Sequence, residues 1–454
     1  MLMSVLREAA DEVPDQPALA AVGRSLTYEA CLARSESFAS GLRQQGIERL
    51  GCVLDDPMEV LPLLAGASAA PSEACVYPNT VDASAVDEYA ARFQHSWVIT
   101  DRPMKLENAT AVPISDLLAD GRARPSDDAE RASLLVLTTG TTGHQRAARH
   151  DWARLLTGVA QTQVDRVERW LVAYNLNQFG GLQVLLHALA TRGTLTFARS
   201  NQPRDVIETI RALAVTHASG TPTFWRLFTA ALSQDDLQEM GLEQITLGGE
   251  AVSQQLLDRL EELFPEARIC HIYGATEFGT ALSVCDGRSG LPISVLERRE
   301  GAKVQLRIVD GELHSRSSVR MLGYHGDEPV RDEWIPTGDL VEVRDDRIRF
   351  VGRTSEIINV GGAKVHPLPV EEVIAAVDGV ELARVYGRPN PITGQLAVAE
   401  VVSRPEVDEE QLEKEIRGAC EALPRAARPR RIEFVDEIET RGSKLARGST
   451  GARG

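Results

Sequence analysis

The stretch Leu134–Arg146 reads LLVLTTGTTGHQR, and it sets an apolar run directly before a loop of threonine and glycine. Leu134–Leu137 is typical of a short buried strand, because it is apolar, bounded by turn residues and too short for a helix. Glycine lets successive backbone N–H groups converge on one point and threonine adds hydroxyl donors, so the loop suits a phosphate. An ordinary polar turn between a strand and a helix also fits the loop taken alone. The P-loop motif does not, since no Lys-Ser or Lys-Thr follows the second glycine.

Composition and charge narrow the classes of function. The chain has 454 residues, 43% of them hydrophobic and 25% charged, which is enough for roughly two or three domains with proper cores. The net charge of −17 argues against nucleic acid or an anionic membrane surface as the main partner. The apolar stretch Leu61–Ala70 is too short to cross a bilayer, and the N-terminus turns acidic within a few residues. We therefore expect a cytoplasmic protein with no membrane span.

The cysteine and histidine spacings predict no metal site. The nine histidines form no HExxH motif, and there is no CxxC pair among the six cysteines, Cys31, Cys52, Cys75, Cys270, Cys285 and Cys420. In a cytoplasmic protein we expect these cysteines to be reduced and partly buried.

Short apolar strands alternate with helical patterns over the first two thirds of the chain. Residues 25–46 place Leu26, Phe38 and Leu42 on one helical face and end at Gly46. The strand at 136–139 leads into a helical pattern at 151–163, and GTLTFA at 193–198 leads into another at 204–215. This alternation predicts a βαβ architecture, in which ligands bind at the carboxyl ends of the strands.

The pattern changes beyond Leu291. Residues 303–317 and 340–353 alternate with a period of two around Asp-Gly and Asp-Asp turns, which predicts β-hairpins. After Arg353 a smaller unit of helices and strands begins, and it ends in a basic, glycine-rich stretch at 441–454 that in isolation resembles a disordered tail. We therefore predict an α/β protein with a large domain at 1–353, built of βαβ subdomains and a β-hairpin, barrel-like part. A small, mobile α+β domain follows at 354–454.

Four more short stretches combine glycine with polar residues, as the first loop does. They are GGEAVS at 248–253, YGATE at 273–277, WIPTGDL at 334–340 with Asp339 expected in a turn, and GRTSEIINVGG at 352–362. Each has an ordinary explanation on its own, because an Asp after Gly is usually a turn residue and a Glu on a loop is usually solvated. Their order and spacing together carry the signal.

In this order the five stretches resemble the motifs of the adenylate-forming (ANL) superfamily. This superfamily contains acyl-CoA synthetases, aryl-acid ligases, nonribosomal-peptide adenylation domains and firefly luciferase. Its Tyr-Gly-x-Thr-Glu and Thr-Gly-Asp elements are intact at 273–277 and 337–339. Its terminal pattern of Thr, Lys and Arg matches Thr440, Lys444 and Arg447, so the tail is not expected to be disordered up to Arg447. The resemblance covers nearly the whole chain.

The resemblance implies a reaction in two steps. ATP first activates a carboxylic acid as an acyl-adenylate and releases pyrophosphate, and the acyl group then passes to the thiol of CoA or of a carrier protein's phosphopantetheine. Two anions meet in the first step, so catalysis depends on charge neutralisation and positioning. The catalytic roles would fall to Lys444, Thr276 and Glu277, and Glu277 would also carry Mg²⁺.

The resemblance also implies sites for the nucleotide and the thiol. The phosphates would lie on a loop formed by Thr138, Thr139, Gly140, Thr141, Thr142 and Gly143. The adenosine would be bound by Gly249, Glu250, Tyr273, Gly274, Asp339 and Arg353, with Tyr273 stacked on adenine and Asp339 accepting from the ribose hydroxyls. The small domain would turn about a hinge at Ser355 and bring a pantetheine tunnel along Gly361 and Gly362.

Two of the departures from the family pattern concern the phosphate loop and the hinge. The usual Pro-Lys-Gly after the phosphate loop is Gln145, Arg146 and Ala147, so the positive charge is kept and the rigid proline is lost. The hinge position, usually Asp or Lys, is Ser355, which puts the kinetics of domain rotation in question.

The acyl pocket is expected between the strand before Asn175 and the segments around Gly248 and Tyr273. Its predicted lining is Asn177, Phe179, Gly180, Gly248 and Ala275, although Phe179 also fits a core aromatic. Asn177 and its neighbour Gln178 are polar beside apolar walls, and no acidic residue is evident that would capture an α-amino group. We expect a small polar or aromatic carboxylic acid.

Three functions stay open on the sequence alone. The first is an AMP-forming acid–thiol ligase, a monomer or homodimer that uses ATP, Mg²⁺ and CoA or an acyl carrier protein. The second gives the activated acyl group to a nitrogen nucleophile. The third is a nucleotide-binding homologue without turnover, which the joint presence of Glu277, Asp339 and Lys444 argues against. The basic run at 424–431 would serve CoA or a carrier protein, or is a solvated face.

Overall fold

The computed structural model describes residues 2–119, 132–138, 145–159, 167–298, 301–331, 333–405, 407–438, 440–441 and 444–445. The predicted phosphate-loop residues at 139–143 lie outside these ranges. Lys444 is described only as part of a backbone strand.

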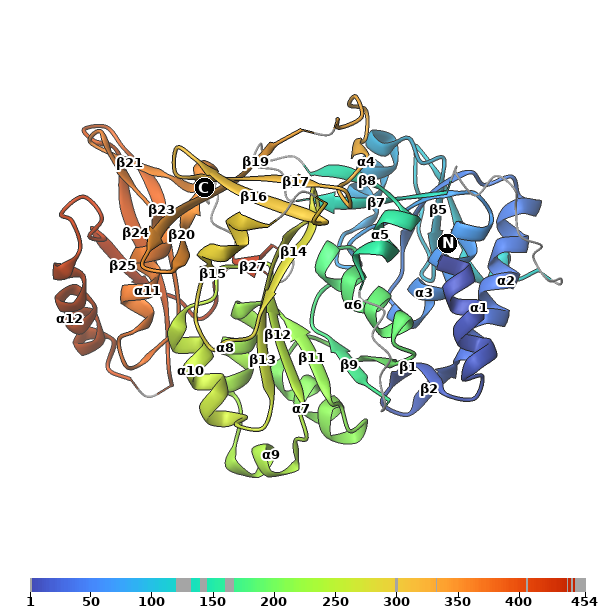
Figure 1. Ribbon diagram of the computed structural model, residues 1–454, viewed down its shortest axis with the longest axis horizontal. Coiled ribbons are helices and arrows are strands. Elements are labelled where there is room, and N and C mark those ends of the chain that lie inside the picture. Colours follow the sequence, from blue (N-terminus) through green and yellow to red (C-terminus); the bar gives the residue numbers. More distant parts are fainter. Residues whose placement is uncertain are drawn as a thin grey trace.

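The first sheet is mainly parallel and forms the lower centre of the molecule in Figure 1. Its strands follow the order β14 (Gly279–Val284), β13 (Arg268–Ala275), β12 (Gln244–Gly248), β11 (His217–Gly220), β9 (Arg169–Val172), β10 (Thr194–Phe197), β1 (Pro17–Ala21) and β2 (Arg24–Thr27). The strands from β13 to β1 are parallel, and β14 and β2 close the two edges in the antiparallel sense. Their carboxyl ends therefore meet along one edge of the sheet.

The second sheet contains the strand predicted before the Thr–Gly loop. Its order is β18 (Gly323–Tyr324), β8 (Arg146–Asp151), β7 (Ser133–Thr138), β4 (Glu73–Val76), β3 (Arg49–Val53), β5 (Trp97–Thr100) and β6 (Thr110–Pro113). The loop does not lead directly to a helix, because β8 first pairs antiparallel with β7. The sequence did not predict β8, and the helical pattern predicted from 151 appears directly after it as α5 (Trp152–Gly158).

The third sheet is built from the predicted hairpins. Its order is β15 (Leu291–Pro292), β20 (Arg347–Arg353), β19 (Ile335–Arg344), β17 (Glu312–Ser317) and β16 (Val304–Val309). The turns fall at Asp310-Gly311 and at Asp345-Asp346, as predicted. Asp339 lies inside β19 and not in a turn before it, because β19 begins at Ile335 and pairs Asp339 with Arg353.

The C-terminal part forms an antiparallel sheet with two helices, drawn in orange and red in Figure 1. Its strands are β22 (Ala363–Val365), β21 (Ile358–Val360), β24 (Gly394–Ser403) and β23 (Val380–Asn390), with β25 (Arg431–Phe434) parallel to β24. The helices are α11 (Pro367–Ala375) and α12 (Glu409–Ala419). A last hairpin pairs β26 (Thr440–Arg441) with β27 (Lys444–Leu445).

Helices cover the two larger sheets and bury separate apolar cores. Residues of α1 (Leu2–Glu12), α2 (Tyr28–Gln44), α3 (Val60–Ala69) and α6 (Phe179–Ala190) share one core with strands of both sheets. A second core joins α7 (Pro203–Ala212), α8 (Pro222–Ala230) and α10 (Gln254–Leu263) to the first sheet. The remaining helices are α4 (Ala83–Phe93) and α9 (Gln234–Glu239). These layers confirm the predicted class, an α/β protein with a barrel-like part and a small α+β domain.

Two further expectations meet the structure here. Cys270 of β13 and Cys285, which directly follows β14, have Cα atoms 4.2 Å apart and form a disulfide. The expectation of six reduced thiols is therefore wrong for this pair, while Cys31, Cys52, Cys75 and Cys420 are free and buried. Over the described ranges, none of the helices has the length and apolar character needed to span a bilayer.

Candidate active site

The predicted substrate and adenine residues gather at the carboxyl edge of the first sheet. Asn177, Phe179 and Gly180 follow β9, and Gly248, Gly249 and Glu250 lie at or after the end of β12. Tyr273, Gly274 and Ala275 end β13, the neighbour of β12. Parallel sheets bind ligands at this edge, where the strands stop and loops diverge.

Tyr174 connects the carboxyl ends of β9, β11 and β12. It is buried just after β9, and its hydroxyl donates to the carbonyl oxygen of Gly220 at 2.9 Å and lies 3.4 Å from that of Gly248. A Cβ atom at Gly248 would come within 3.1 Å of this hydroxyl oxygen. Glycine at 248 therefore lets Tyr174 approach the β12 backbone and shape the predicted acyl pocket.

Tyr273 and Arg353 hold the carboxylate of Asp339 from two sides. The Tyr273 hydroxyl donates to Oδ2 at 2.8 Å, and Nε of Arg353 donates to Oδ1 at 2.8 Å. Asp339 is only 9% exposed, and burial together with the nearby Asp339 charge raises the pKa of Tyr273 well above its usual range. The tyrosine therefore stays a proton donor at neutral pH, and the carboxylate is fixed in place across two sheets.

The Tyr273 ring is largely enclosed. It packs against Phe350 and Phe278, with ring centroids 5.0 Å and 5.6 Å away, and is 9% exposed. The structure thus gives Tyr273 a role in orienting Asp339, and stacking on adenine stays a prediction.

Glu277 and Thr276 lie in the turn between β13 and β14. The Tyr324 hydroxyl donates to Oε1 of Glu277 at 2.7 Å. The Arg146 guanidinium lies 3.5 Å from the centre of the Tyr324 ring, and Arg146 also forms an ion pair with Asp327. The charge that replaces the family's lysine is therefore next to the carboxylate predicted to carry Mg²⁺.

His150 is fully buried under the predicted acyl pocket. Its ring lies 5.8 Å from that of Phe179. Burial lowers the pKa of His150 to about 4, although a backbone hydrogen bond with Thr276 acts to raise it. Phe179 is partly buried and packs against the main core. His150 is therefore a neutral, fully buried neighbour of Phe179, the residue predicted to line the pocket.

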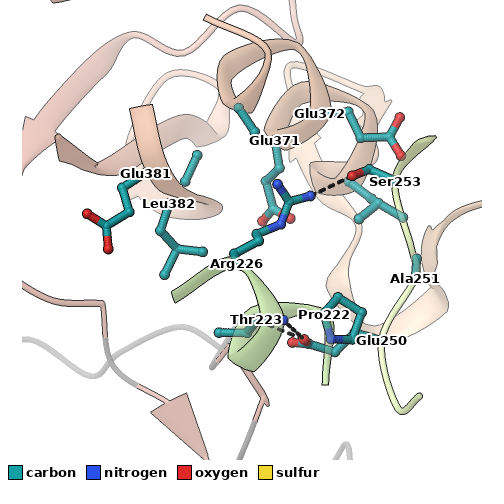
Figure 2. Close-up of a pocket in the computed structure, with 13 residues that line it drawn as sticks. Pro222, Thr223, Arg226, Glu250, Ala251, Ser253, Glu371, Glu372, Glu381 and Leu382 are labelled. Carbon is teal, nitrogen blue, oxygen red and sulfur yellow. Dashed lines mark hydrogen bonds between the residues drawn. The ribbon is translucent and has the colours of Figure 1, made fainter. Parts of the chain in front are cut away.

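A small cavity of about 50 Å³ lies between the large and small domains. Figure 2 shows Arg226 extending from α8 toward α11, with its guanidinium bonded to Oγ of Ser253 at 2.7 Å. Glu371 and Glu372 of α11 face the same cavity, and Glu250 accepts from the backbone N–H and hydroxyl of Thr223 at 3.0 Å and 2.7 Å. Burial lowers the pKa of Arg226 and raises that of Glu372.

The other predicted residues lie in separate places. Thr138 ends β7, and its hydroxyl is 3.4 Å from the carbonyl oxygen of Arg146. Ser355 is exposed in the short turn after β20, and Gly361 and Gly362 form the exposed β21–β22 turn with φ of 58° and 87°. In Figure 1 β21 lies at the outer edge of the molecule, far from the ends of β12 and β13.

Comparison with known proteins decides the family. A model described as AMP-binding enzyme matches residues 59–325, more than half of the chain, and its C-terminal-domain model matches 369–444. The chain belongs to the AMP-binding enzyme family. The predicted adenylate-forming resemblance is thereby confirmed.

The relatives of this AMP-binding enzyme include CoA ligases. It is 27% identical over 320 residues to an octahydro-1H-inden-4-yl-propanoyl:CoA ligase of Mycobacterium tuberculosis, covering 67% of this chain and 62% of that protein, less than two thirds of its length. It is 26% identical to the 4-chlorobenzoate–CoA ligase of a Pseudomonas species, over 96% of this chain and 90% of that protein.

Solved structures share the fold over nearly the whole chain. The anthranilate CoA ligase AuaEII, in complex with anthranoyl-AMP, gives a TM-score of 0.82 at 20% identity, covering 98% of this chain and 95% of that one. The O-succinylbenzoate CoA synthetase of Bacillus subtilis, in complex with ATP and a magnesium ion, gives 0.77 at 19%, covering 97% and 98%. The enzyme is thus an AMP-forming ligase whose relatives include acid–CoA ligases.

The residues of the site fit a magnesium ion that is shared with a nucleotide. Within the described part of the chain there is no group of three or more His, Cys, Asp or Glu placed to hold a metal. Mg²⁺ commonly uses one or two carboxylates and takes its other ligands from substrate phosphates and water. A single carboxylate, Glu277, which is linked through Tyr324 to Arg146, matches that arrangement.

Tyr324 and Arg226 are among the residues of these clusters that were not predicted from the sequence. Tyr324 stands in a short Gly-Tyr pair that carries no motif by itself, and only its contact with Glu277 reveals it. Arg226 lies in the helical stretch TFWRLF, where the sequence pattern predicts that an arginine points into solvent.

Proposed function

We propose that the enzyme joins a small aromatic or polar carboxylic acid to CoA, with ATP and Mg²⁺ as the activating pair. The observation that supports this most is the convergence of Glu277 and the Tyr273–Asp339–Arg353 cluster at the edge where Asn177 and Gly248 lie. The carboxylate proposed to bind Mg²⁺, the carboxylate proposed to accept from the ribose hydroxyls and the proposed acyl pocket are then close together. Residues 1–353 would bind the acid and ATP, and residues 354–454 would supply Lys444.

In the first step a carboxylate oxygen attacks the α-phosphorus of ATP. An O–P bond forms, and the bond to pyrophosphate breaks. The role of Lys444 is to place a positive charge against the α-phosphate and the acid as negative charge builds between them. Glu277 would hold Mg²⁺, which would supply positive charge to screen the leaving pyrophosphate.

Asp339 is suited to hold the ribose during this step. A carboxylate has about four lone-pair positions, and among the described residues the Tyr273 hydroxyl and Arg353 Nε each donate to one of its two oxygens. The remaining positions can accept from two ribose hydroxyls. Gly249 and Glu250 would border the adenine, and the loop at 138–143 would bind the β- and γ-phosphates.

In the second step the thiol sulfur attacks the acyl carbonyl. A C–S bond forms, the bond to AMP breaks, and the thiol proton is lost to solvent. The small domain would turn at Ser355 to bring Gly361 and Gly362 to the site, where the absence of side chains lets a slender pantetheine arm pass. We place the reaction in the cytoplasm, where ATP and CoA are available.

The acyl pocket supports an aromatic or otherwise flat acid. Its proposed walls are the neutral His150–Phe179 pair and the Tyr174 clamp over Gly248, with Ala275 and Gly180 leaving room and Asn177 offering a hydrogen bond. A curated relative that the chain covers almost entirely is named for 4-chlorobenzoate.

A product assay tests this proposal. The enzyme is incubated with ATP, Mg²⁺ and a panel of benzoates, cinnamates and short aliphatic acids, with CoA, with a phosphopantetheinyl carrier protein, or with an amine. We expect AMP and an acyl-CoA whose mass identifies one class of acid. Thioester only on the carrier protein, or amide only with the amine, would replace CoA as the acceptor.

A further inference from the structure

Arg146, Glu277 and Tyr324 come from three segments that the fold brings to one side of the proposed nucleotide site. Tyr324 pairs with Ala148 where β18 meets β8, the strand that begins at Arg146. Just before β18, the backbone N–H of Met321 donates to the carbonyl oxygen of Glu277 at 3.1 Å. The backbone of β18 is therefore fixed to both neighbours, and the Tyr324 ring projects between their side chains.

The Tyr324 hydroxyl controls one oxygen of the Glu277 carboxylate. It donates to Oε1 at 2.7 Å. A carboxylate held at one oxygen is limited to few rotamers, and its other oxygen keeps its lone pairs for a cation.

Arg146 in turn holds the Tyr324 ring. Its guanidinium carbon is 3.5 Å from the ring centre, and Asp327 pairs with the guanidinium. The backbone N–H of Asp327 also donates to the Tyr324 carbonyl oxygen at 3.1 Å. A flat guanidinium can stack on an aromatic ring while it pairs with a carboxylate, which a lysine ammonium does less well.

We propose that Tyr324 is a positioning residue for the magnesium carboxylate and that Arg146 acts through Tyr324. This inference rests on the proposed role of Glu277 as the magnesium ligand. It gives the arginine at the position of the family's lysine a specific task, which is to keep the tyrosine hydroxyl on Glu277 and not to bind phosphate directly. Arg146, Tyr324 and Glu277 then form one chain of contacts that ends at the metal.

The test is the magnesium dependence of ATP binding, measured by calorimetry without any acid substrate. Tyr324→Phe removes the hydroxyl and keeps the ring. We expect the Mg²⁺ concentration needed for half-maximal enhancement of ATP binding to rise about five- to tenfold, the size of one lost charge-assisted hydrogen bond. Binding of ATP without metal should stay within about twofold of the wild-type value, because no nucleotide contact is removed.

Tyr28→Phe is the matched control. The Tyr28 hydroxyl is buried and donates to the carbonyl oxygen of Gly193 at 2.7 Å, the same length as the Tyr324 bond. Its loss should lower the unfolding temperature and leave the magnesium dependence unchanged. A change in the magnesium dependence of both variants would mean a general structural effect and would overturn the proposal.

Arg146→Lys tests the second half of the inference and leaves the hydroxyl in place. We expect a smaller shift, about two- to fourfold, which disappears when the substitution is made in the Tyr324→Phe background. Additive effects, or weaker ATP binding without metal, would show that Arg146 contacts the phosphates itself and would overturn its assignment.

Glu277→Gln separates this inference from the role on which it rests. If Glu277→Gln weakens the magnesium dependence of ATP binding and Tyr324→Phe does not, the positioning role of Tyr324 is wrong, while the role of Glu277 as the magnesium ligand is supported. If neither changes it, the assignment of Glu277 itself fails.

Discussion

Asp339 has a neighbour on each carboxylate oxygen and still keeps acceptor positions for a ligand. Arg353 and Tyr273 approach from different strands, so the carboxylate cannot turn away.

Asp339→Asn should weaken ATP binding without changing the fold. The amide keeps the shape, but it loses the charge and turns one acceptor into a donor, so the two ribose bonds weaken together. We expect the KM for ATP in pyrophosphate exchange to rise about 10- to 100-fold, with a smaller change in kcat.

Asp286→Asn is the control for Asp339→Asn. Asp286 also binds an arginine, Arg347, at 2.7 Å, and that arginine is buried. This control should lower the unfolding temperature and leave the KM for ATP unchanged. A normal KM in Asp339→Asn would contradict the ribose role.

At the scale of residues, the sequence predicts motif members better than their partners. Asp339, Glu277 and Tyr273 were predicted because each stands in a motif of several residues. Tyr324 and Arg226 were not, because their partners are distant in the chain and are brought close only by the sheets. The position of Asp339 was also wrong in detail, since the strand β19 extends through it.

At the scale of elements, the β12 end and Tyr174 define the proposed acyl pocket together. Gly248→Ala would place a Cβ atom 3.1 Å from the Tyr174 hydroxyl oxygen and push the ring toward the pocket. We expect the KM for the acid to rise about threefold to tenfold, most for the bulkiest acids, with the KM for ATP nearly unchanged. Substrate series measured at saturating ATP would show it.

Gly418→Ala provides the comparison for Gly248→Ala. It lies in α12, and a Cβ atom there meets nothing within 4 Å. The helix should gain stability slightly, and the kinetics should not change. If Gly248→Ala changed the KM values of large and small acids by the same factor, the pocket assignment would be refuted.

The disulfide beside the β13–β14 pair predicts the number of reactive thiols. With Cys270 bonded to Cys285, denatured protein prepared without reductant should show four reactive thiols, and six after reduction. A dithionitrobenzoate titration in guanidinium measures this directly. Six thiols before reduction would mean that the pair is open.

Elements with their own apolar pattern were predicted well, including β7, β10, α7 and the two hairpins. β8 was missed because RAARHD has a polar, helix-like pattern, and it becomes a strand by pairing with β7 on one side and β18 on the other. Leu26 likewise lies in β2 and not on the following helix, because the Thr27 side chain caps α2.

At the scale of the whole molecule, residues of α8 in the large domain and α11 in the small domain line one cavity. Arg226 faces Glu371 and Glu372 across the boundary (Figure 2), while β21 with the predicted tunnel glycines is far from the site. We infer that this orientation of the small domain serves adenylation, and that Arg226 stabilises it relative to the thioester-forming one. The boundary after Arg353 and the hinge at Ser355 stay predictions.

Arg226→Met should therefore change the two half-reactions unequally. We expect pyrophosphate exchange to slow about threefold to tenfold, while thioester formation from a supplied acyl-adenylate and CoA keeps its rate. Arg211→Met is the control, because Arg211 pairs with Asp236 and Glu239 within the large domain. Equal slowing of both half-reactions would contradict a role in domain orientation.

The central claim is that this chain adenylates a carboxylic acid with the help of Lys444. The most direct measurement is ATP–pyrophosphate exchange with pooled carboxylic acids, for the native chain and for Lys444→Ala. We predict exchange with at least one pool, a loss of about 100-fold or more in the variant, and ATP binding that both proteins retain. Exchange that is absent from every pool, or undiminished in Lys444→Ala, would contradict the account.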